Sequence, residues 1–386
     1  MSKKEKRIYE HFIAMTAVVF SGIIVILIIC NFALKDKTFS EQENRMLQTQ
    51  PDLTADRVLN GTFESDFESY VNDQFPFRNA WISLKSTAER MLGKTESNGV
   101  YLGKDGYLME DFVEPETDNY KKTLSAIASF SNNNKDIKQY FMLVPNAVNV
   151  ESDLLPAQAP VGNQNQTMEA FYKDLATTGF ENVDVRDTLL KSENQQLYYR
   201  TDHHWTTDAA FLAFGQLADT LGLQVNDAAY NRYMVSDSFN GTLSSKSGFR
   251  SGETDNIYIY APKEGTQPDS VITYVEEQDK TGTFYNRKQL DTKDQYAMFL
   301  DGNHAEIKIE TPTQENNRLL ILKDSYANCL IPFLAPYYRE IVVIDPRYYY
   351  DDLQELIEVE EINQILFLYN ANTFFTDTSL KNITLS

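Results

Sequence analysis

The chain has 386 residues, of which 42% are hydrophobic and 24% charged, and this ordinary globular composition excludes disorder as its default state. A formal net charge of −21 argues against a nucleic-acid partner, because a phosphate backbone is bound through basic surface. Two cysteines, Cys30 and Cys329, exclude a disulfide framework, since the first lies in an apolar stretch. The fold must therefore rest on a hydrophobic core.

An uncharged apolar stretch of 23 residues occupies positions 12–34. At ~1.5 Å per residue it can cross a ~30 Å hydrocarbon core. Basic side chains dominate residues 1–11, so the bias of Lys and Arg predicts a cytoplasmic tail and an external remainder. A cleaved signal peptide is the alternative, although the stretch is long for one and no A-x-A site follows it. We expect a single-pass cell-membrane protein whose main part is extracellular or periplasmic.

A tether and a helical arm are predicted over residues 35–110. The segment directly after the apolar stretch is polar and contains a proline, which is typical of a short tether. Apolar side chains then recur at helical spacing, at Phe63, Phe67, Tyr70 and Val71. Pro76 interrupts this pattern. We expect core packing to explain the aromatic side chains of the arm.

Short apolar runs alternate with helical stretches from residue 111 onward. "YFMLVP" and "NVDVRD", the latter at 182–187, are predicted strands, and this alternation is typical of a parallel α/β sheet. A helix is predicted over 206–221, with Thr206 or Thr207 as its cap and Gly222 at its end. The sequence "DHHW" therefore falls on the loop between a strand and this helix.

The composition changes between residues 222 and about 314, where Tyr, Ser, Gly and Thr dominate and short alternating runs occur. This pattern predicts a β-rich insertion. The α/β pattern then returns with "RLLILKDSYAN", "REIVVIDP" and "NQILFLYNA", which predict three strands joined by helical connections.

A serine directly follows the first of these three strands, in "LLILKDSYAN". Functional sites in parallel α/β sheets form at the carboxyl ends of strands, so Ser325 stands where a nucleophile is useful. A serine at this place is also a common helix N-cap. The motif alone leaves both interpretations open.

The "DHHW" loop supplies groups that can activate a serine hydroxyl. Asp202 and His204 are two residues apart and point the same way if the loop is extended, whereas His203 then points away. A serine needs an imidazole to take its proton and a carboxylate to orient that imidazole. This predicts Ser325 as nucleophile, His204 as base and Asp202 as its orienting group.

The loop has two other interpretations. A metal site would draw on Asp202, both adjacent histidines and His304, but no HExxH motif or cysteine pair supplies a usual frame, so we expect no metal ion. A purely structural role would have His203 and Trp205 packing and His204 capping a helix.

Several motifs together resemble the DHHW family, named for the sequence found here at Asp202 to Trp205. "FSEQENRML", "DQFPFR", "FNGTLSSKSG", "FLDGNH", "LKDSYAN" and "DPRYY" follow in that family's order. The family is similar to the alginate acetyltransferases AlgX and AlgJ, and through them to SGNH hydrolases. The resemblance implies a flavodoxin-like, SGNH hydrolase-like α/β domain with a parallel sheet over residues 111–386, and no soluble cofactor.

The resemblance also implies a circular permutation, because "KDS" follows "DHHW" here whereas the Gly-Asp-Ser strand comes first in ordinary SGNH enzymes. In this frame Asn370 matches the asparagine that donates a hydrogen bond to an oxyanion, with the Tyr326 backbone as a second donor. Two departures are Lys323, in place of the glycine of Gly-Asp-Ser, and Leu368, in place of the glycine of G-x-N-D.

The activity implied by the resemblance is O-acetylation of a cell-surface or secreted polysaccharide through an acyl group on Ser325. It implies a polytopic membrane-bound O-acyltransferase as the partner that supplies the acetyl group. One alternative is an esterase that removes acetyl groups with the same triad. The other is a non-catalytic carbohydrate-binding or scaffold protein of the cell surface.

Overall fold

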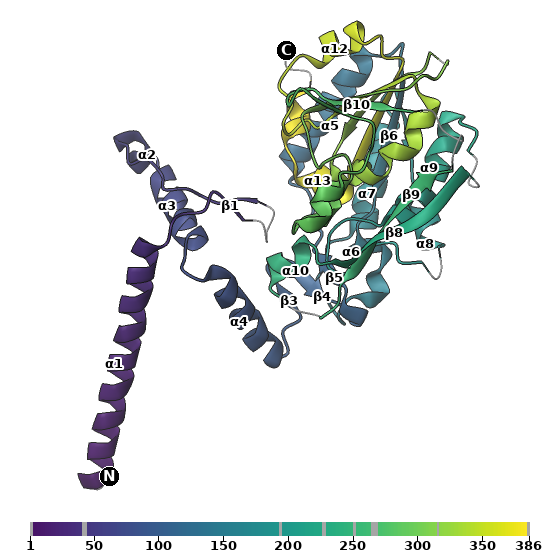
Figure 1. Ribbon diagram of the computed structural model, residues 1–386. Helices are drawn as coiled ribbons and strands as arrows, with labels where there is room; N and C mark the ends of the chain where they lie inside the picture. Colours follow the sequence, from purple (N-terminus) through teal and green to yellow (C-terminus); the bar gives the residue numbers. More distant parts are fainter. Residues whose placement is uncertain are drawn as a thin grey trace. The chain divides into compact units, whose positions relative to one another are not determined.

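The computed structural model (Figure 1) describes residues 3–40, 45–192, 195–225, 229–249, 252–263, 269–314 and 316–383, so part of the "FSEQENRML" motif lies outside the described residues. The chain divides into two compact units, Met1–Leu92 and Gly93–Ser386.

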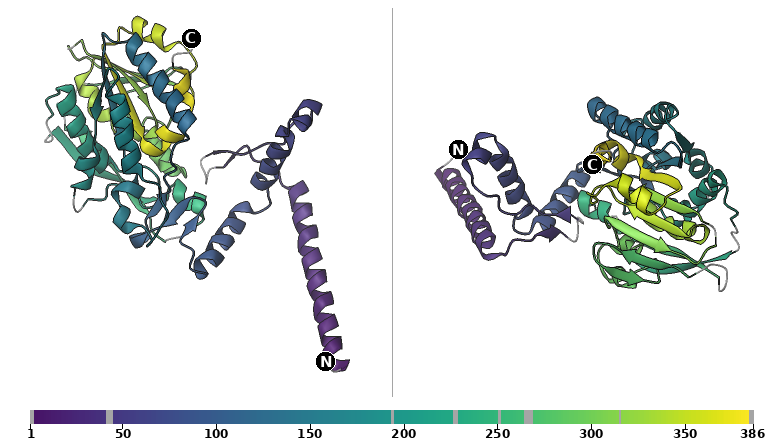
Figure 2. Two further views of the ribbon diagram at one scale, coloured as in Figure 1. Left: turned by 180° about the vertical axis from the view of Figure 1, so that it is seen from behind. Right: turned by 90° about the horizontal axis from the view of Figure 1, so that it is seen from above.

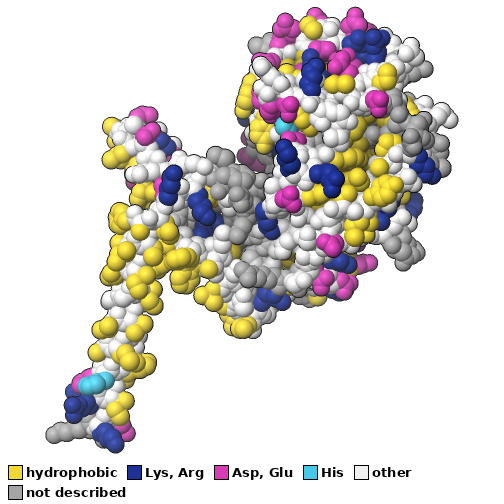
Figure 3. All heavy atoms as spheres, in the orientation of Figure 1, with side chains coloured by type: hydrophobic (Ala, Val, Ile, Leu, Met, Phe, Trp, Pro, Cys, Tyr) yellow, Lys and Arg dark blue, Asp and Glu magenta, His cyan; other side chains and the backbone are white. Residues whose placement is uncertain are grey.

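A long apolar helix, α1 (Lys3–Ala33), begins the first unit. Among the described residues α1 is long and apolar enough to cross a membrane, a property shared by membrane anchors and signal sequences. Hydrophobic side chains cover most of its length in Figure 3, and basic side chains gather at its N-terminal end. These features fit the predicted membrane anchoring.

The other described residues of the first unit form a short strand pair and three helices. The elements are β1 (Phe39–Ser40), β2 (Arg45–Met46), α2 (Ala55–Leu59), α3 (Thr62–Asp73) and α4 (Arg78–Met91). None of the residues of α3, all of which are described, is buried, and Phe63 and Phe67 instead stack with ring centroids 5.8 Å apart. The prediction that core packing explains these aromatics is therefore wrong for the described residues of α3, whose rings contact one another and remain partly exposed.

An eight-stranded sheet organises the second unit, with strand order β11-β10-β12-β14-β13-β15-β6-β7. In chain order the strands are β6 (Lys138–Val144), β7 (Phe180–Val183), β10 (Val271–Tyr274), β11 (Asp279–Thr281), β12 (Glu306–Glu310), β13 (Arg318–Lys323), β14 (Glu340–Ile344) and β15 (Gln364–Asn370). The five strands from β14 to β7 are parallel. Counted from β13 they have the order 2-1-3-4-5, which is that of flavodoxin. The predicted permuted, flavodoxin-like fold is confirmed.

Helices pack against this sheet, as the further views in Figure 2 show. The longer ones are α5 (Thr117–Asn133), α7 (Gln164–Leu175), α9 (Thr207–Leu221) and α12 (Leu353–Val359), and the shorter ones are α6 (Ala147–Val150), α8 (Arg186–Leu190), α11 (Ile331–Leu334) and α13 (Ala371–Thr376). A further short helix, α10 (Thr242–Ser247), packs elsewhere. The Thr206 hydroxyl caps α9 by accepting from the Ala209 N–H at 3.3 Å, and Gly222 ends it with φ 72°. The prediction for 206–221 is confirmed.

The second unit begins before the predicted boundary at residue 110. β3 (Glu96–Ser97), β4 (Val100–Leu102) and β5 (Leu108–Glu110) form a small antiparallel sheet. Its buried Val100 and Leu108 pack against Leu243 and Phe249. These contacts, made with residues far along the chain, place 93–110 with the α/β unit.

The segment 222–314 is rich in strands, as predicted, yet it is not separate from the main sheet. β12 pairs antiparallel with β14, so β10, β11 and β12 extend the central sheet. The remaining strands of this segment, β8 (Tyr230–Phe239) and β9 (Asp255–Pro262), form an irregular antiparallel pair. The predicted strand at 182–187 lies two residues earlier, at Phe180–Val183, because Arg186 already begins α8.

Candidate active site

Ser325 stands at the carboxyl end of β13, where a short 3-10 helix begins. The N-cap of that helix is Asp324, so Ser325 is not the capping residue. The Asp324 carboxylate accepts from the Tyr326 N–H at 2.9 Å and from the backbone and side-chain nitrogens of Asn370 at 2.8 and 2.7 Å. Burial raises the pKa of Asp324 to about 6. Asp324 therefore fixes the turn that presents Ser325.

The imidazole of His204 joins Ser325 to Asp202. Its Nε2 lies 2.7 Å from Ser325 Oγ, and its Nδ1 lies 2.6 Å from Asp202 Oδ1. His204 and Asp202 are only 6% and 1% exposed, and Ser325 is half-buried. The structure thus brings together the three side chains that the sequence singled out, in the geometry in which a carboxylate orients an imidazole toward a hydroxyl.

The loop that carries Gly241 and Thr242 holds the Asp202 carboxylate from the other side. Asp202 Oδ2 accepts from the backbone N–H of Thr242 at 2.8 Å and from its hydroxyl at 2.9 Å. A Cβ at Gly241 would lie 2.2 Å from the Cβ of Asp202, so this close approach requires glycine. In the sequence, Gly241 and Thr242 were noted only as part of the family motif "FNGTLSSKSG", and no role was predicted for them.

Asp255 anchors the backbone of the "DHHW" loop. Its buried carboxylate accepts from the backbone N–H groups of Arg200 and Thr201, both at 2.9 Å, and from the Thr201 hydroxyl at 2.7 Å. A second contact ties the loop to the nucleophile turn: Trp205 Nε1 donates to the backbone carbonyl of Tyr326 at 2.9 Å. Sequence reasoning missed Asp255, because no motif or periodicity marks it.

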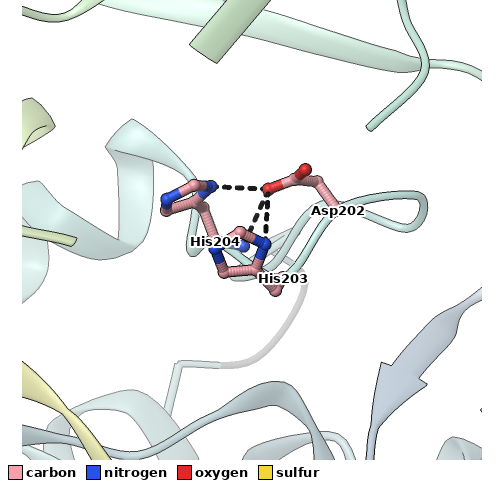
Figure 4. A group of neighbouring side chains, drawn as sticks. All are labelled: Asp202, His203 and His204. Atoms are coloured by element: carbon pink, nitrogen blue, oxygen red, sulfur yellow. Dashed lines mark hydrogen bonds and ion pairs between the residues drawn. The ribbon is translucent and has the colours of Figure 1, made fainter. Parts of the chain in front are cut away.

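His203 lies beside His204, as Figure 4 shows, and the prediction that it points away is wrong. The two ring centroids are 3.9 Å apart, and His203 Nδ1 lies 3.0 Å from the Thr242 hydroxyl. The loop bends at these residues instead of running extended, so neighbouring side chains do not alternate.

Asp202, His203 and His204 also offer ligand atoms within 4.8 Å of one another, which is close enough to hold a metal ion. The same atoms make hydrogen bonds within the site. His204 Nδ1 lies against Asp202 and His204 Nε2 against Ser325, and Asp202 Oδ2 accepts from the Thr242 N–H. The expectation that the site works without a metal stays a prediction.

Burial lowers the pKa of His204 to about 4, with a further contribution from His203 and against the opposing effect of Asp202. Burial acts to raise the pKa of Asp202, but His203, His204 and the Thr242 N–H outweigh it and hold that pKa well below its usual range. At neutral pH the pair is therefore a neutral imidazole beside a carboxylate. This is the state in which His204 can accept a proton from Ser325.

We expect a fluorophosphonate to label Ser325 covalently at a rate that is constant near neutral pH. The rate should fall in acid, with an apparent pKa of about 4. The reason is that an imidazolium cannot take the hydroxyl proton. The rate constants are measured by mass spectrometry, with circular dichroism at each pH to restrict the fit to folded protein. An acid limb at the ordinary histidine value, about 6.5, contradicts the buried environment of His204.

The two predicted oxyanion donors both face Asp324. Asn370 Nδ2 donates to Asp324 Oδ2 and to the Thr373 hydroxyl at 2.7 and 2.8 Å, and the Tyr326 N–H donates to Asp324 Oδ1 at 2.9 Å. Asn370 is 2% exposed. In this structure both groups hold the nucleophile turn, and their role toward an oxyanion stays a prediction.

Lys323, which precedes this turn in place of a glycine, is fully buried in an ion network. Its Nζ lies 2.7 Å from Asn303 Oδ1 and 3.4 Å from Asp345 Oδ2. Asp345 also accepts from Arg347 Nε and Nη2 at 2.8 and 2.6 Å. Burial lowers the pKa of Lys323, whereas for Asp345 the neighbouring Lys323 and Arg347 outweigh burial and lower its pKa. The network ties the end of β13 to the end of β14.

Replacing Asp345 by alanine is expected to lower the free energy of unfolding by about 3–5 kcal/mol, because it leaves the ammonium group of Lys323 buried without its counter-ion. Urea unfolding followed by circular dichroism measures the change. Asp351→Ala, an exposed aspartate on the same loop, is the matched control and should change stability by less than about 0.5 kcal/mol. Equal effects of the two substitutions contradict the structural importance of the network.

The fold and the site define an SGNH hydrolase-like α/β protein, with a flavodoxin-like sheet and Ser325, His204 and Asp202 in hydrogen-bond contact. Residues 100–293 match the family model described as SGNH hydrolase-like domain, acetyltransferase AlgX. That match covers half of the chain, and the chain belongs to this family. The matched part includes Asp202 and His204, and Ser325 lies beyond it.

Curated relatives carry the name probable alginate O-acetylase AlgJ. The protein from Azotobacter vinelandii is 27% identical over 183 residues, which are 44% of this chain and 46% of the relative. The protein from Pseudomonas fluorescens is 25% identical over 172 residues, which are 42% of this chain and 44% of the relative. The chain thus spans less than half the length of these relatives.

Solved structures share the fold of the second unit. A DHHW family protein from Eubacterium siraeum has a TM-score of 0.66 at 22% identity, over 75% of this chain and 97% of that one. PatB1 of Bacillus cereus, solved with a sulfonyl adduct, has a TM-score of 0.63 at 23% identity, over 74% and 98%. These likenesses and the family match confirm the recognition made from the sequence motifs.

Proposed function

We propose that this protein is an extracytoplasmic O-acetyltransferase that modifies a cell-surface or secreted polysaccharide through an acyl-Ser325 intermediate. The observation that carries the proposal is the buried contact chain from Ser325 Oγ to His204 Nε2 at 2.7 Å and from His204 Nδ1 to Asp202 Oδ1 at 2.6 Å. The family description as an acetyltransferase and the relatives named alginate O-acetylases support acetyl transfer to a polysaccharide.

The proposed reaction has two halves. Ser325 Oγ attacks the acyl carbonyl while His204 takes the serine proton, and His204 then returns this proton to the leaving oxygen as the donor's ester bond breaks. An acceptor hydroxyl next attacks the acyl-Ser325 ester, gives its proton to His204, and expels Ser325 Oγ, which recovers the proton. Asp202 stabilises the imidazolium in both halves. Asn370 and Tyr326 remain the proposed oxyanion donors, which requires that they exchange their contact with Asp324.

The proposed location follows from α1 and its basic N-terminal flank: a cytoplasmic N-terminus, one membrane span, and an external second unit. A membrane-bound O-acyltransferase is the proposed donor partner, which passes acetyl groups across the membrane to Ser325. If α1 is removed as a signal sequence, the second unit keeps the same side of the membrane.

The proposal is tested with the full chain in detergent, an activated acetyl ester and oligosaccharide acceptors. Mass spectrometry of the sugars and an assay for free acetate separate the candidate functions. Acetylated sugar formed at the expense of free acetate supports the transferase. Release of acetate alone, together with deacetylation of an acetylated polysaccharide, supports the esterase that the same triad geometry allows. Sugar binding without turnover of the ester supports the non-catalytic alternative.

A further inference from the structure

Tyr296 contacts both the base and the nucleophile of the proposed triad. It lies in a short 3-10 helix, Gln295–Met298, within the β-rich segment. Its ring stacks on the His204 imidazole with centroids 3.6 Å apart and an interplanar angle of 11°. Its hydroxyl donates to the backbone carbonyl of Ser325 at 3.2 Å. Tyr296 is 2% exposed, so its ring seals one face of the imidazole from water.

Lys293, two residues before this helix, supports the loop that holds Asp202. Lys293 Nζ donates to the backbone carbonyl of Asn240 and, at 3.2 Å, to its side-chain oxygen. Asn240 is followed by Gly241 and by Thr242, which binds Asp202 Oδ2. Residues 293–296 therefore reach the surroundings of all three triad members.

We propose that Tyr296 is a positioning residue, which fixes the plane of the His204 ring against the backbone of Ser325. The inference rests on the proposed function. Rotation about the bond that joins an imidazole to its side chain is soft, so a ring held only by two hydrogen bonds can tilt. The nearly parallel Tyr296 ring, with centroids 3.6 Å apart, blocks that tilt. The hydrogen bond from the Tyr296 hydroxyl to the Ser325 carbonyl sets the distance between the Tyr296 ring and the nucleophile.

The other groups that face the imidazole are Asp202, His203, Ser325 and Tyr326, and Arg347 acts on it electrostatically from farther away. A substitution at position 296 leaves all of these side chains unchanged. Removal of the stacked ring admits water to the face of the imidazole, and burial then lowers the His204 pKa less. The acid limb of the labelling rate must therefore move to higher pH.

The experiment compares three variants of the full chain by the rate of Ser325 labelling with a fluorophosphonate as a function of pH. Tyr296→Leu removes the ring and should slow labelling ~100-fold. It should also move the acid limb from about 4 toward about 6.5. Tyr296→Phe keeps the ring and loses the hydroxyl, so labelling should slow by about threefold to tenfold with the acid limb unmoved. Tyr285→Phe is the matched control, because it also removes a hydrogen bond from a tyrosine hydroxyl to a backbone carbonyl, that of Tyr260 at 3.3 Å. This variant should label at the wild-type rate.

The outcomes separate this inference from the proposed function. Absence of labelling in the wild type overturns the nucleophile and the positioning role with it. A wild type that labels on Ser325 while folded Tyr296→Leu keeps the same rate and pH profile overturns the positioning role alone. If circular dichroism shows that Tyr296→Leu is unfolded, Tyr296→Phe decides, and a rate equal to that of Tyr285→Phe overturns the proposal.

Discussion

Replacement of Ser325 by alanine is expected to abolish acyl-enzyme formation and to lower turnover of an activated acetyl ester on the order of 10⁶-fold. The reason is that Ser325 Oγ, 2.7 Å from His204 Nε2, is the atom that forms the bond to the acyl carbon in the proposed reaction. His204→Ala should cost about as much, since the hydroxyl then lacks a base, and the double variant should be no slower than either single one. Mass mapping after treatment with a sulfonyl fluoride or fluorophosphonate locates the adduct.

A suitable control is Ser192→Ala, which removes a half-buried hydroxyl that donates to the Thr188 carbonyl at 2.8 Å and has no contact with the triad among the described residues. This variant should label as the wild type does. An adduct that persists in Ser325→Ala, or a wild type that is folded yet unlabelled, rejects the nucleophile. The binding-protein alternative then becomes the leading interpretation.

Asp202→Asn is expected to slow acylation by about 10³–10⁴-fold while the protein stays folded. The side chain keeps its shape and can still accept from Thr242 through its oxygen. An amide N–H directed at His204 Nδ1, however, favours the tautomer in which Nε2 carries the proton and cannot take another from Ser325. The measurement is the rate of labelling at neutral pH, together with the midpoint of thermal unfolding.

The control for this substitution is Asp208→Asn. Asp208 also binds through both oxygens, to Arg232 Nε and Nη2 at 2.7 and 2.6 Å, and it lies on the first turn of α9, close in sequence to the site. A similar loss of rate in both variants assigns the effect to stability and not to the orientation of His204. A loss confined to Asp202→Asn supports the orienting role.

The sequence predicted the parallel part of the sheet because its strands are continuous apolar runs that are buried on both faces, as in β13, β14 and β15. The permutation was predicted from the resemblance to SGNH hydrolases, because the motifs occur here in a different order from that of ordinary SGNH enzymes. The boundary at Gly93 could not be predicted, because β3, β4 and β5 are each two or three residues long and have no periodicity to detect.

The groups that surround the triad could not be predicted from the sequence for a different reason. Thr242 binds Asp202 across 40 residues and Asp255 binds Thr201 across 54, and such pairings between loops leave no trace in spacing or composition. The stack of Tyr296 on His204 is of the same kind. Ser325, His204 and Asp202 were predictable because their chemistry restricts the residue types, whereas many residue types can support them.

The permuted strand order also dictates when the fold can be completed. β13 lies in the middle of the sheet between β14 and β15, yet it begins only at Arg318. A nascent chain that has not reached β13 also lacks β15, the strand that pairs with β6. The apolar β6 then has an unpaired edge, which is prone to pair with other chains. His204 is thus synthesised 121 residues before the serine it contacts. The site can therefore be assembled only after the C-terminal strands have been synthesised, and until then the edge of β6 that later pairs with β15 is open.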